Sequence, residues 1–98
     1  GRVIDAISAG MAGSKMLDLI GPKMAARDFL AGIEARLHAK DIAMVAAAAQ
    51  ELGIDMPATA VVNRQLERLL ALGWGREDTS SLLRVIEAHA TGGSNLAA

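Results

Sequence analysis

The longest stretch of this sequence without glycine or proline covers residues 33–52, and alanine is its commonest residue. Alanine, leucine and methionine favour the α-helix, and Gly53 follows at the position where glycine commonly ends one. From residue 42 onward the stretch is apolar on nearly every side, which is typical of a helix that is buried on several sides. We therefore expect a central helix over about residues 33–52.

Placing successive residues about 100° apart around this helix separates two apolar faces. The first is centred on Leu37 and contains, within about 60° of it, Ile33, Met44, Ala48 and Leu52. The second face lies on the opposite side and contains Ile42, Ala46 and Ala49. We predict that the Leu37 face is the main apolar stripe, and that the alanines let neighbouring helices approach closely.

Glycine and proline divide the rest of the chain into shorter helical segments. A segment over about residues 2–8 is expected to stop at Gly10. A second segment, over about residues 13–19, is expected to break at Gly21-Pro22, because proline disfavours helix at the residue before it. Residues 22–30 are then predicted to be irregular or to form a brief helical turn.

Two further helices are predicted towards the C-terminal end. One begins near Pro57, a residue suited to the first helical position, and ends at Gly73. The other begins with Asp78 or Thr79 as its N-cap. Because no segment has a convincing strand pattern, we predict an all-α fold, a compact bundle of four to six helices around residues 33–52. Residues 1–90 would form this domain and residues 91–98 a flexible tail.

Charge and composition argue against several classes of protein. The net charge is −1 and the basic residues are scattered, which argues against a nucleic-acid partner. The absence of cysteine rules out disulfides and thiolate metal sites, and neither histidine has a metal-ligand spacing. The longest apolar run, residues 42–49, is far shorter than the roughly 20 residues that cross a bilayer. We expect no metal, no membrane contact and a cytoplasmic location.

Three other features have simple structural explanations. The segment Gly10–Lys15 superficially resembles a phosphate-binding loop, but its spacing differs and no strand precedes it, so a helix–helix turn is expected there. His38 is expected at a helix surface, and His89 in a last helical turn, where the helix dipole favours a cation. The adjacent carboxylates Glu77-Asp78 precede a helix and are better explained by capping than by acid–base catalysis.

The Lys40-Asp41 pair is the least ordinary feature, because both residues flank the Leu37 stripe. Lys40 falls about 60° to one side of Leu37 and Asp41 about 40° to the other. A charge beside a packed face needs a partner. The alternative is a surface lysine whose stem lies along apolar surface while its ammonium group reaches water. The residues alone favour this alternative.

Four short motifs occur in a particular order. They are Ser14-Lys15-Met16-Leu17 with Gly21-Pro22-Lys23-Met24, then Asp28-Phe29 with Gly32-Ile33 and Lys40-Asp41-Ile42, then Gly53 to Pro57, then Gly73-Trp74-Gly75 with Asp78. Together they resemble the C-terminal domain of the β-hydroxyacid dehydrogenase family. That family includes 3-hydroxyisobutyrate dehydrogenase, tartronate semialdehyde (2-hydroxy-3-oxopropionate) reductase and L-threonate dehydrogenase. The resemblance covers about residues 3–89.

The resemblance implies a fold like the C-terminal domain of 6-phosphogluconate dehydrogenase, and roles for particular residues. Lys40 corresponds to the family lysine that reaches NAD or NADP near the nicotinamide, with Ile33 and Asp41 as candidate neighbours. Asp41 would anchor the helix start or orient Lys40. Several relatives have phenylalanine at the position of Ile33, so the contact there would be weaker or differently shaped. No catalytic residue is expected in this chain.

The resemblance also implies what must lie outside the chain. A Rossmann domain that binds most of the NAD or NADP, and the lysine that acts as general acid and base, would both lie upstream. The complete enzyme would interconvert a β-hydroxyacid and its oxo form, with a small anionic hydroxyacid as substrate, and would be a homodimer or homotetramer. The isolated chain is expected to be inactive.

Two alternatives to an active dehydrogenase stay open. The chain could be a non-enzymatic helical module that binds another protein. It could also belong to a relative that kept the fold and lost catalysis. Upstream sequence with a Gly-x-Gly-x-x-Gly motif and a helix bearing a lysine would favour the enzyme.

Overall fold

The computed structural model describes residues 1–90, and these form helices joined by turns and short extended segments. In chain order the elements are α1 (Arg2–Ser8), α2 (Lys15–Ala26), α3 (Ala35–Leu52), α4 (Pro57–Ala71), the 3-10 helix η1 (Thr79–Ser81) and α5 (Leu82–Ala90). The only β-type pairing among these residues is an isolated bridge between Glu34 and Asp78. The predicted all-α class is confirmed. The predicted flexible tail, residues 91–98, lies outside the described residues.

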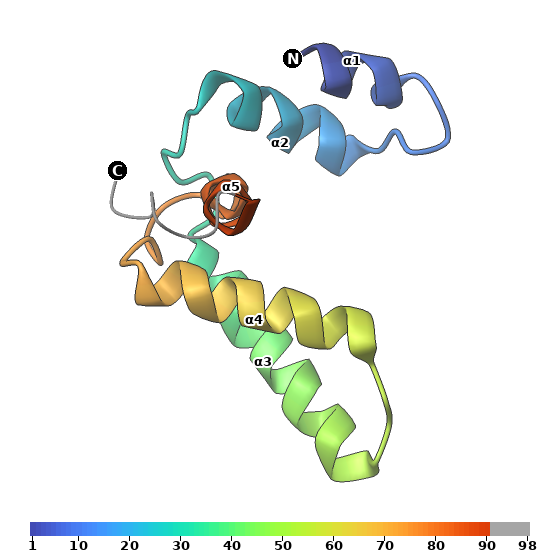
Figure 1. Cartoon of the computed structure of the whole chain (residues 1–98), viewed down its shortest axis with the longest axis vertical. Coiled ribbons are helices and arrows are strands. Elements are labelled where there is room, and N and C mark those ends of the chain that lie inside the picture. Colours follow the sequence, from blue (N-terminus) through green and yellow to red (C-terminus); the bar gives the residue numbers. More distant parts are fainter. Residues whose placement is uncertain (91–98) are drawn as a thin grey trace.

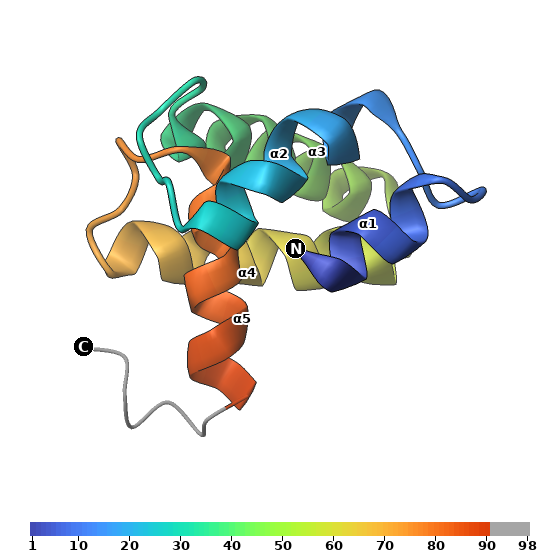
Figure 2. The same cartoon turned by 90° about the horizontal axis from the view of Figure 1, so that it is seen from above.

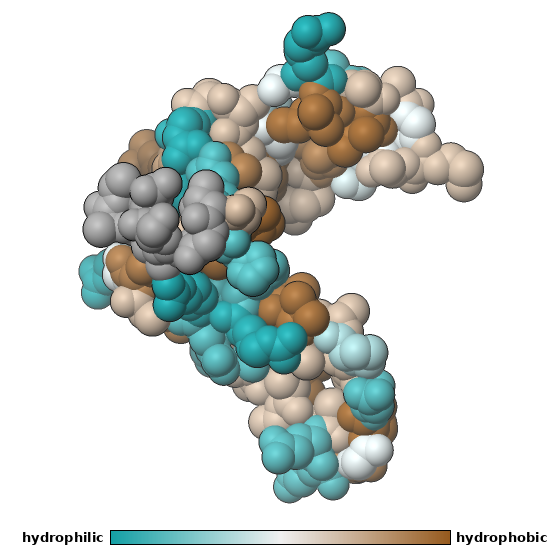
Figure 3. Space-filling view, viewed as in Figure 1, coloured by the Kyte–Doolittle hydropathy of each residue, from teal (hydrophilic) through white to brown (hydrophobic). Residues whose placement is uncertain are grey.

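The helices are arranged in two arms (Figure 1). One arm is the pair α1 and α2, and the other is the pair α3 and α4. Between them, η1 contacts α2 and α3, while α5 contacts α4; Figure 2 shows α5 crossing α4. The space-filling view shows an opening between the arms, with apolar residues exposed on both (Figure 3). The longest helix, α3, is therefore part of one arm and not the centre of a bundle as expected.

The face of α3 that packs against α4 is the opposite of the predicted one. Small residues are buried there, namely Ala35, Ala39 and Ala49. The predicted stripe is exposed, with Leu37 at 42%, Met44 at 62% and Leu52 at 73%. Alanine lets two helix backbones approach closely, so Leu66 and Leu69 of α4 can fill the contact. Periodicity identified both faces, but it could not say which one α4 covers.

The predicted break at Gly21-Pro22 is also wrong, because α2 continues through Pro22 to Ala26. An interior proline costs about 3 kcal/mol, since it removes one backbone hydrogen bond and crowds the preceding turn. Tertiary contacts support the helix on both sides of the proline. Gly21 is buried against Ile4 of α1, and the Lys23 ammonium group donates to the carbonyl oxygen of Leu30 at 2.8 Å.

Helix ends that depend on local residues were predicted well. Gly53 and Gly73 have left-handed backbone angles, with φ of 68° and 85°, just after α3 and α4. Pro57 is the first residue of α4, and Asp78 is the N-cap of η1. The exception is the start of α3, which begins at Ala35. Gly32 and Ile33 lie in the irregular segment before α3, although the predicted helix begins at about residue 33.

A small apolar core joins α3, α4 and α5. Ala35, Leu69 and Val85 are buried together, and Leu72, Trp74 and Leu82 pack around them. The N-terminal end of α3 is held beside this core by backbone hydrogen bonds: the amide of Ala35 donates to the carbonyl of Glu77, and that of Arg36 to the carbonyl of Gly75, each at 2.8 Å. These carbonyls take the place of a side-chain cap. No helix within residues 1–90 is long and apolar enough to cross a membrane.

Candidate functional site

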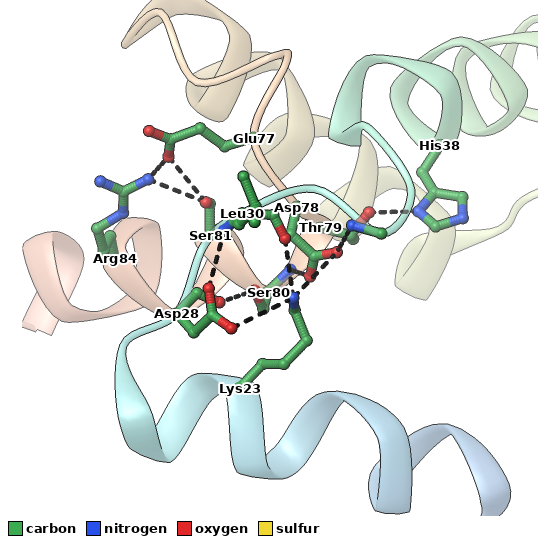
Figure 4. A network of polar contacts seen from close by, with 11 residues as sticks. Lys23, Asp28, Leu30, His38, Glu77, Asp78, Thr79, Ser80, Ser81 and Arg84 are labelled. Carbon is green, nitrogen blue, oxygen red and sulfur yellow. Dashed lines mark hydrogen bonds and ion pairs between the residues drawn. The ribbon is translucent and has the colours of Figure 1, made fainter.

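Asp78 is the centre of a polar network beside the N-terminal end of α3 (Figure 4). Its side chain is buried, with residue 78 only 2% exposed. One carboxylate oxygen, Oδ1, accepts from the amide of Gly32 at 2.9 Å. The other, Oδ2, accepts from the amide of Ser80 at 3.0 Å. The carboxylate therefore caps η1 and also holds the segment that leads into α3.

Lys23 reaches the same network from α2 (Figure 4). Its ammonium nitrogen is 4.0 Å from Asp78 Oδ1 and 3.8 Å from an oxygen of Asp28. The ammonium group also donates to the carbonyl of Leu30. One cation thus joins the end of α2 and the segment that follows it to Asp78, which is distant in the sequence.

The pKa of Asp78 results from opposing effects. Burial favours the neutral carboxylic acid and so raises the pKa. The hydrogen bonds from Ser80 and Gly32, together with the positive charge of Lys23, favour the carboxylate and outweigh burial. The pKa of Asp78 is therefore below its ordinary value of 3.8, and the group is ionised at neutral pH. Sequence reasoning identified its capping role but missed its contact with Gly32, 46 residues away.

His38 and Thr79 form a second contact between α3 and η1. Nδ1 of His38 is 2.5 Å from the hydroxyl oxygen of Thr79, and both residues are half-buried. His38 therefore does more than lie at a helix surface, because it ties α3 to η1. His89 is in the last turn of α5, as predicted, and is exposed.

Lys40 and Asp41 lie one turn further along α3, on its exposed side. Neither side chain forms a hydrogen bond or ion pair with any part of the chain that the structure describes. Asp41 therefore does not anchor the helix start, which the carbonyls of Glu77 and Gly75 hold instead. Nor does any such bond link Asp41 to Lys40 within residues 1–90.

Ile33 is presented just before this face of α3. It is 52% exposed and precedes the helix by two residues. On the helical wheel Lys40 and Asp41 share the face of Leu37 and Met44, which α4 leaves uncovered. The result is an apolar surface on which the side chains of Lys40 and Asp41 are not bonded to each other. A lysine beside apolar side chains can contact a ligand that combines a flat apolar ring with negative charge.

The described residues contain no cluster of candidate metal ligands. Residues 1–90 contain no group of three or more His, Asp or Glu side chains placed to hold an ion. The segment Gly10–Lys15 joins α1 to α2 as a turn, with Ser14 capping α2 through a 2.9 Å hydrogen bond from the amide of Leu17. This agrees with the helix–helix turn expected there.

A sequence profile for the family described as "NAD-binding of NADP-dependent 3-hydroxyisobutyrate dehydrogenase" matches residues 1–86. The chain belongs to this family. Its cofactor class, NAD or NADP, is the one expected from the sequence.

Two curated relatives agree with this assignment. The chain is 32% identical over 89 residues to 2-hydroxy-3-oxopropionate reductase of Escherichia coli (strain K12), covering 91% of this chain and 30% of that protein. It is 34% identical over 86 residues to the probable mitochondrial 3-hydroxyisobutyrate dehydrogenase-like 1 of Arabidopsis thaliana, covering 88% of this chain and 26% of that protein. The chain thus spans less than a third of the length of these relatives.

Proposed function

We propose that the chain is the C-terminal domain of an NAD(P)-dependent oxidoreductase that interconverts a β-hydroxyacid and its oxo form. The domain would supply one wall of the cleft that holds cofactor and substrate. The observation that carries this proposal is the exposed face of α3, where Lys40 has no partner within residues 1–90. The family match and both relatives support the same reading.

The residues of this face suit a nicotinamide cofactor. Exposed Ile33 and Leu37 offer apolar contact to a flat ring, and Lys40 offers a cation to a phosphate or to an anionic substrate. When bound, the cofactor supplies the hydride chemistry. Lys40 would bind and orient, and the general acid and base would be a lysine outside this chain. Asp41 would set the local charge around Lys40 without a direct bond to it.

Apolar side chains that are exposed on both arms support the proposal that the chain is part of a larger assembly. Large apolar side chains are exposed on both arms, including Met16 and Leu19 on α2 and Met44 and Val45 on α3. Exposed apolar patches of this kind mark contacts with another domain or subunit. We propose that the remaining domain and a second subunit, in a homodimer or homotetramer, cover them. A cytoplasmic location stays a proposal based on composition.

The test is a comparison between the full-length protein that contains this chain and the chain alone. The full-length protein is assayed with a panel of β-hydroxyacids in the presence of NAD or NADP, and the chain alone is assayed identically. We expect turnover by the full-length protein and none by the chain. Turnover by the chain alone, or none by a folded full-length protein that also fails to bind NAD(H) or NADP(H), would contradict the proposal.

A second candidate is a helical module that binds another protein without catalysis. The exposed apolar side chains favour it as much as they favour an enzyme domain. The two differ upstream of this chain. A Gly-x-Gly-x-x-Gly motif after a strand would indicate the nucleotide-binding domain of an enzyme, and its absence from the full-length sequence would favour the module.

A further inference from the structure

Residues 28–34 connect α2 to α3 and present Ile33, yet they form no regular element. Side chains from α2, from the segment itself and from the N-cap of η1 hold it in place. Asp28 Oδ1 accepts from the amide of Leu30 at 3.2 Å, and the Leu30 carbonyl accepts from Lys23 at 2.8 Å. Two residues later, the amide of Gly32 donates to Asp78 Oδ1. Hydrogen bonds therefore hold the segment at Leu30 and at Gly32, on the N-terminal side of Ile33.

Asp78 holds the segment at more than one point. Its backbone amide donates to the carbonyl of Phe29 at 2.9 Å, while its side chain accepts from Gly32. Because Ile33 is half-exposed, packing of its own side chain does not fix its position. The backbone on either side fixes it instead, through Gly32 and through the bond from the Ala35 amide to the carbonyl of Glu77.

We propose that Asp78 is a positioning residue for the cofactor cleft: it sets the place of Ile33, with Lys23 as its ionic partner. This inference rests on the proposed function, because it assumes that Ile33 contacts a nicotinamide cofactor. It adds that Asp78, which lies 45 positions after Ile33, determines whether Ile33 makes this contact. Asp78 itself would not contact the cofactor. Asp78 thus has a task beyond capping η1.

A carboxylate is needed because Asp78 accepts through both oxygens. Serine is as good an N-cap as aspartate, so Asp78→Ser keeps an acceptor for the Ser80 amide. The shorter side chain cannot also reach Gly32, and it removes the charge near Lys23. Asp78→Ser therefore separates the two tasks, since it spares the cap and removes the side-chain bond to Gly32.

The experiment measures steady-state kinetics of the full-length protein and of three variants. Asp78→Ser and Lys23→Met each remove one side-chain bond to residues 28–34: the first removes the bond to the Gly32 amide, the second the bond to the Leu30 carbonyl. Ser81→Ala is the matched control, because Ser81 is as buried as Asp78 and lies in the 3-10 helix that Asp78 caps, while its hydroxyl bonds only to Glu77 and Arg84 among residues 1–90. Amide hydrogen exchange of residues 28–35 is followed in parallel.

We expect Asp78→Ser to raise the KM for the cofactor about three- to tenfold with kcat nearly unchanged. This is the result when a mutation removes a binding contact that is equally strong in the ground state and in the transition state. Lys23→Met should also raise the KM for the cofactor, and both variants should speed amide hydrogen exchange at Gly32. Ser81→Ala should lower stability without changing this KM. If Asp78→Ser does not fold, Lys23→Met together with exchange at Gly32 decides the question.

The outcomes separate this inference from the proposed function. An active wild-type protein whose KM is the same in Asp78→Ser, Lys23→Met and Ser81→Ala would overturn the positioning role and leave the proposed function intact. A KM that rises equally in all three variants would overturn it as well, because the effect would then follow stability. A folded wild-type protein without cofactor binding would overturn both.

Discussion

The guanidinium carbon of Arg84 lies 3.9 Å from the centre of the Trp74 ring. The same carbon is 4.2 Å from the centre of the Phe29 ring, and Nη2 of Arg84 forms an ion pair with Glu77. Trp74 and Phe29 are the only aromatic residues of the sequence, so both contact one cation. This contact joins α5, the turn after α4 and the segment after α2.

Replacing Arg84 should therefore destabilise the fold. We expect Arg84→Met to lower the free energy of unfolding by about 1–3 kcal/mol, because the ring contacts and the bonds to Glu77 and Ser81 are lost. Arg84→Lys should recover less than half of this loss, since lysine lacks the flat guanidinium group. Urea unfolding followed by the fluorescence of Trp74 measures both. Arg64→Met, at an exposed position of α4, is the control; an equal effect there would contradict the role of Arg84.

Lys40→Ala should weaken cofactor binding in the full-length protein. Removing a cation that contacts a phosphate or a substrate carboxylate is expected to raise the corresponding KM about tenfold. The stability of the isolated chain should change little, because Lys40 is exposed and unpaired among residues 1–90. Lys15→Ala, another exposed lysine, serves as control. Unchanged KM and kcat in Lys40→Ala would remove Lys40 from the site.

The stability contributed by Asp78 should depend on pH. Its pKa in the folded chain is below the ordinary value of 3.8, so ionised Asp78 stabilises the fold at neutral pH. This contribution is complete above the unfolded pKa and is lost as the pH falls through the folded pKa. Asp78→Asn should be about 1–2 kcal/mol less stable than wild type at pH 7, and the difference should shrink as the pH falls below the ordinary aspartate value of 3.8.

Urea unfolding at a series of pH values measures this difference. Asp55→Asn, in the exposed segment between α3 and α4, is the control, and a difference of the same size and trend there would contradict the role of Asp78. A difference between Asp78→Asn and wild type that stays constant from neutral to acidic pH would be evidence against the role of the carboxylate charge.

Gly21→Ala tests the contact between α1 and α2. Alanine would favour the helix by about 1 kcal/mol, but its methyl group would lie 2.9 Å from Cγ2 of Ile4. Overpacking of this kind costs about 1–3 kcal/mol, so we expect net destabilisation. In an Ile4→Ala background the clash is gone, and the same change should stabilise. Thermal unfolding of the four chains tests this reversal; the same sign in both backgrounds would contradict it.

The exposed stripe of α3 should matter only in the assembled protein. Met44→Glu is expected to change the stability of the isolated chain by less than about 0.5 kcal/mol, as for other surface changes. In the full-length protein it should weaken assembly, because a charge would then be buried. Sedimentation of both proteins measures this. An unaltered assembly would mean that this part of α3 stays uncovered.

Local chemistry determined most of the helix boundaries from the sequence alone. Gly53 and Gly73 follow α3 and α4 because glycine adopts left-handed backbone angles without strain. Pro57 starts α4 because its missing amide would be unpaired there anyway. The resemblance carried by short motifs gave the family, which the comparisons show. These features depend on residues close together in the chain.

The tertiary structure decided what depends on distant partners. Both faces of α3 are apolar, and only the approach of α4 selects the one with alanines. Pro22 stays inside α2, where Gly21 packs against Ile4 and Lys23 bonds to Leu30. Asp78 meets Gly32 across 46 residues, a pairing that no spacing in the sequence indicates. Periodicity describes one helix at a time, whereas each of these outcomes depends on which surface of another element comes to lie beside it.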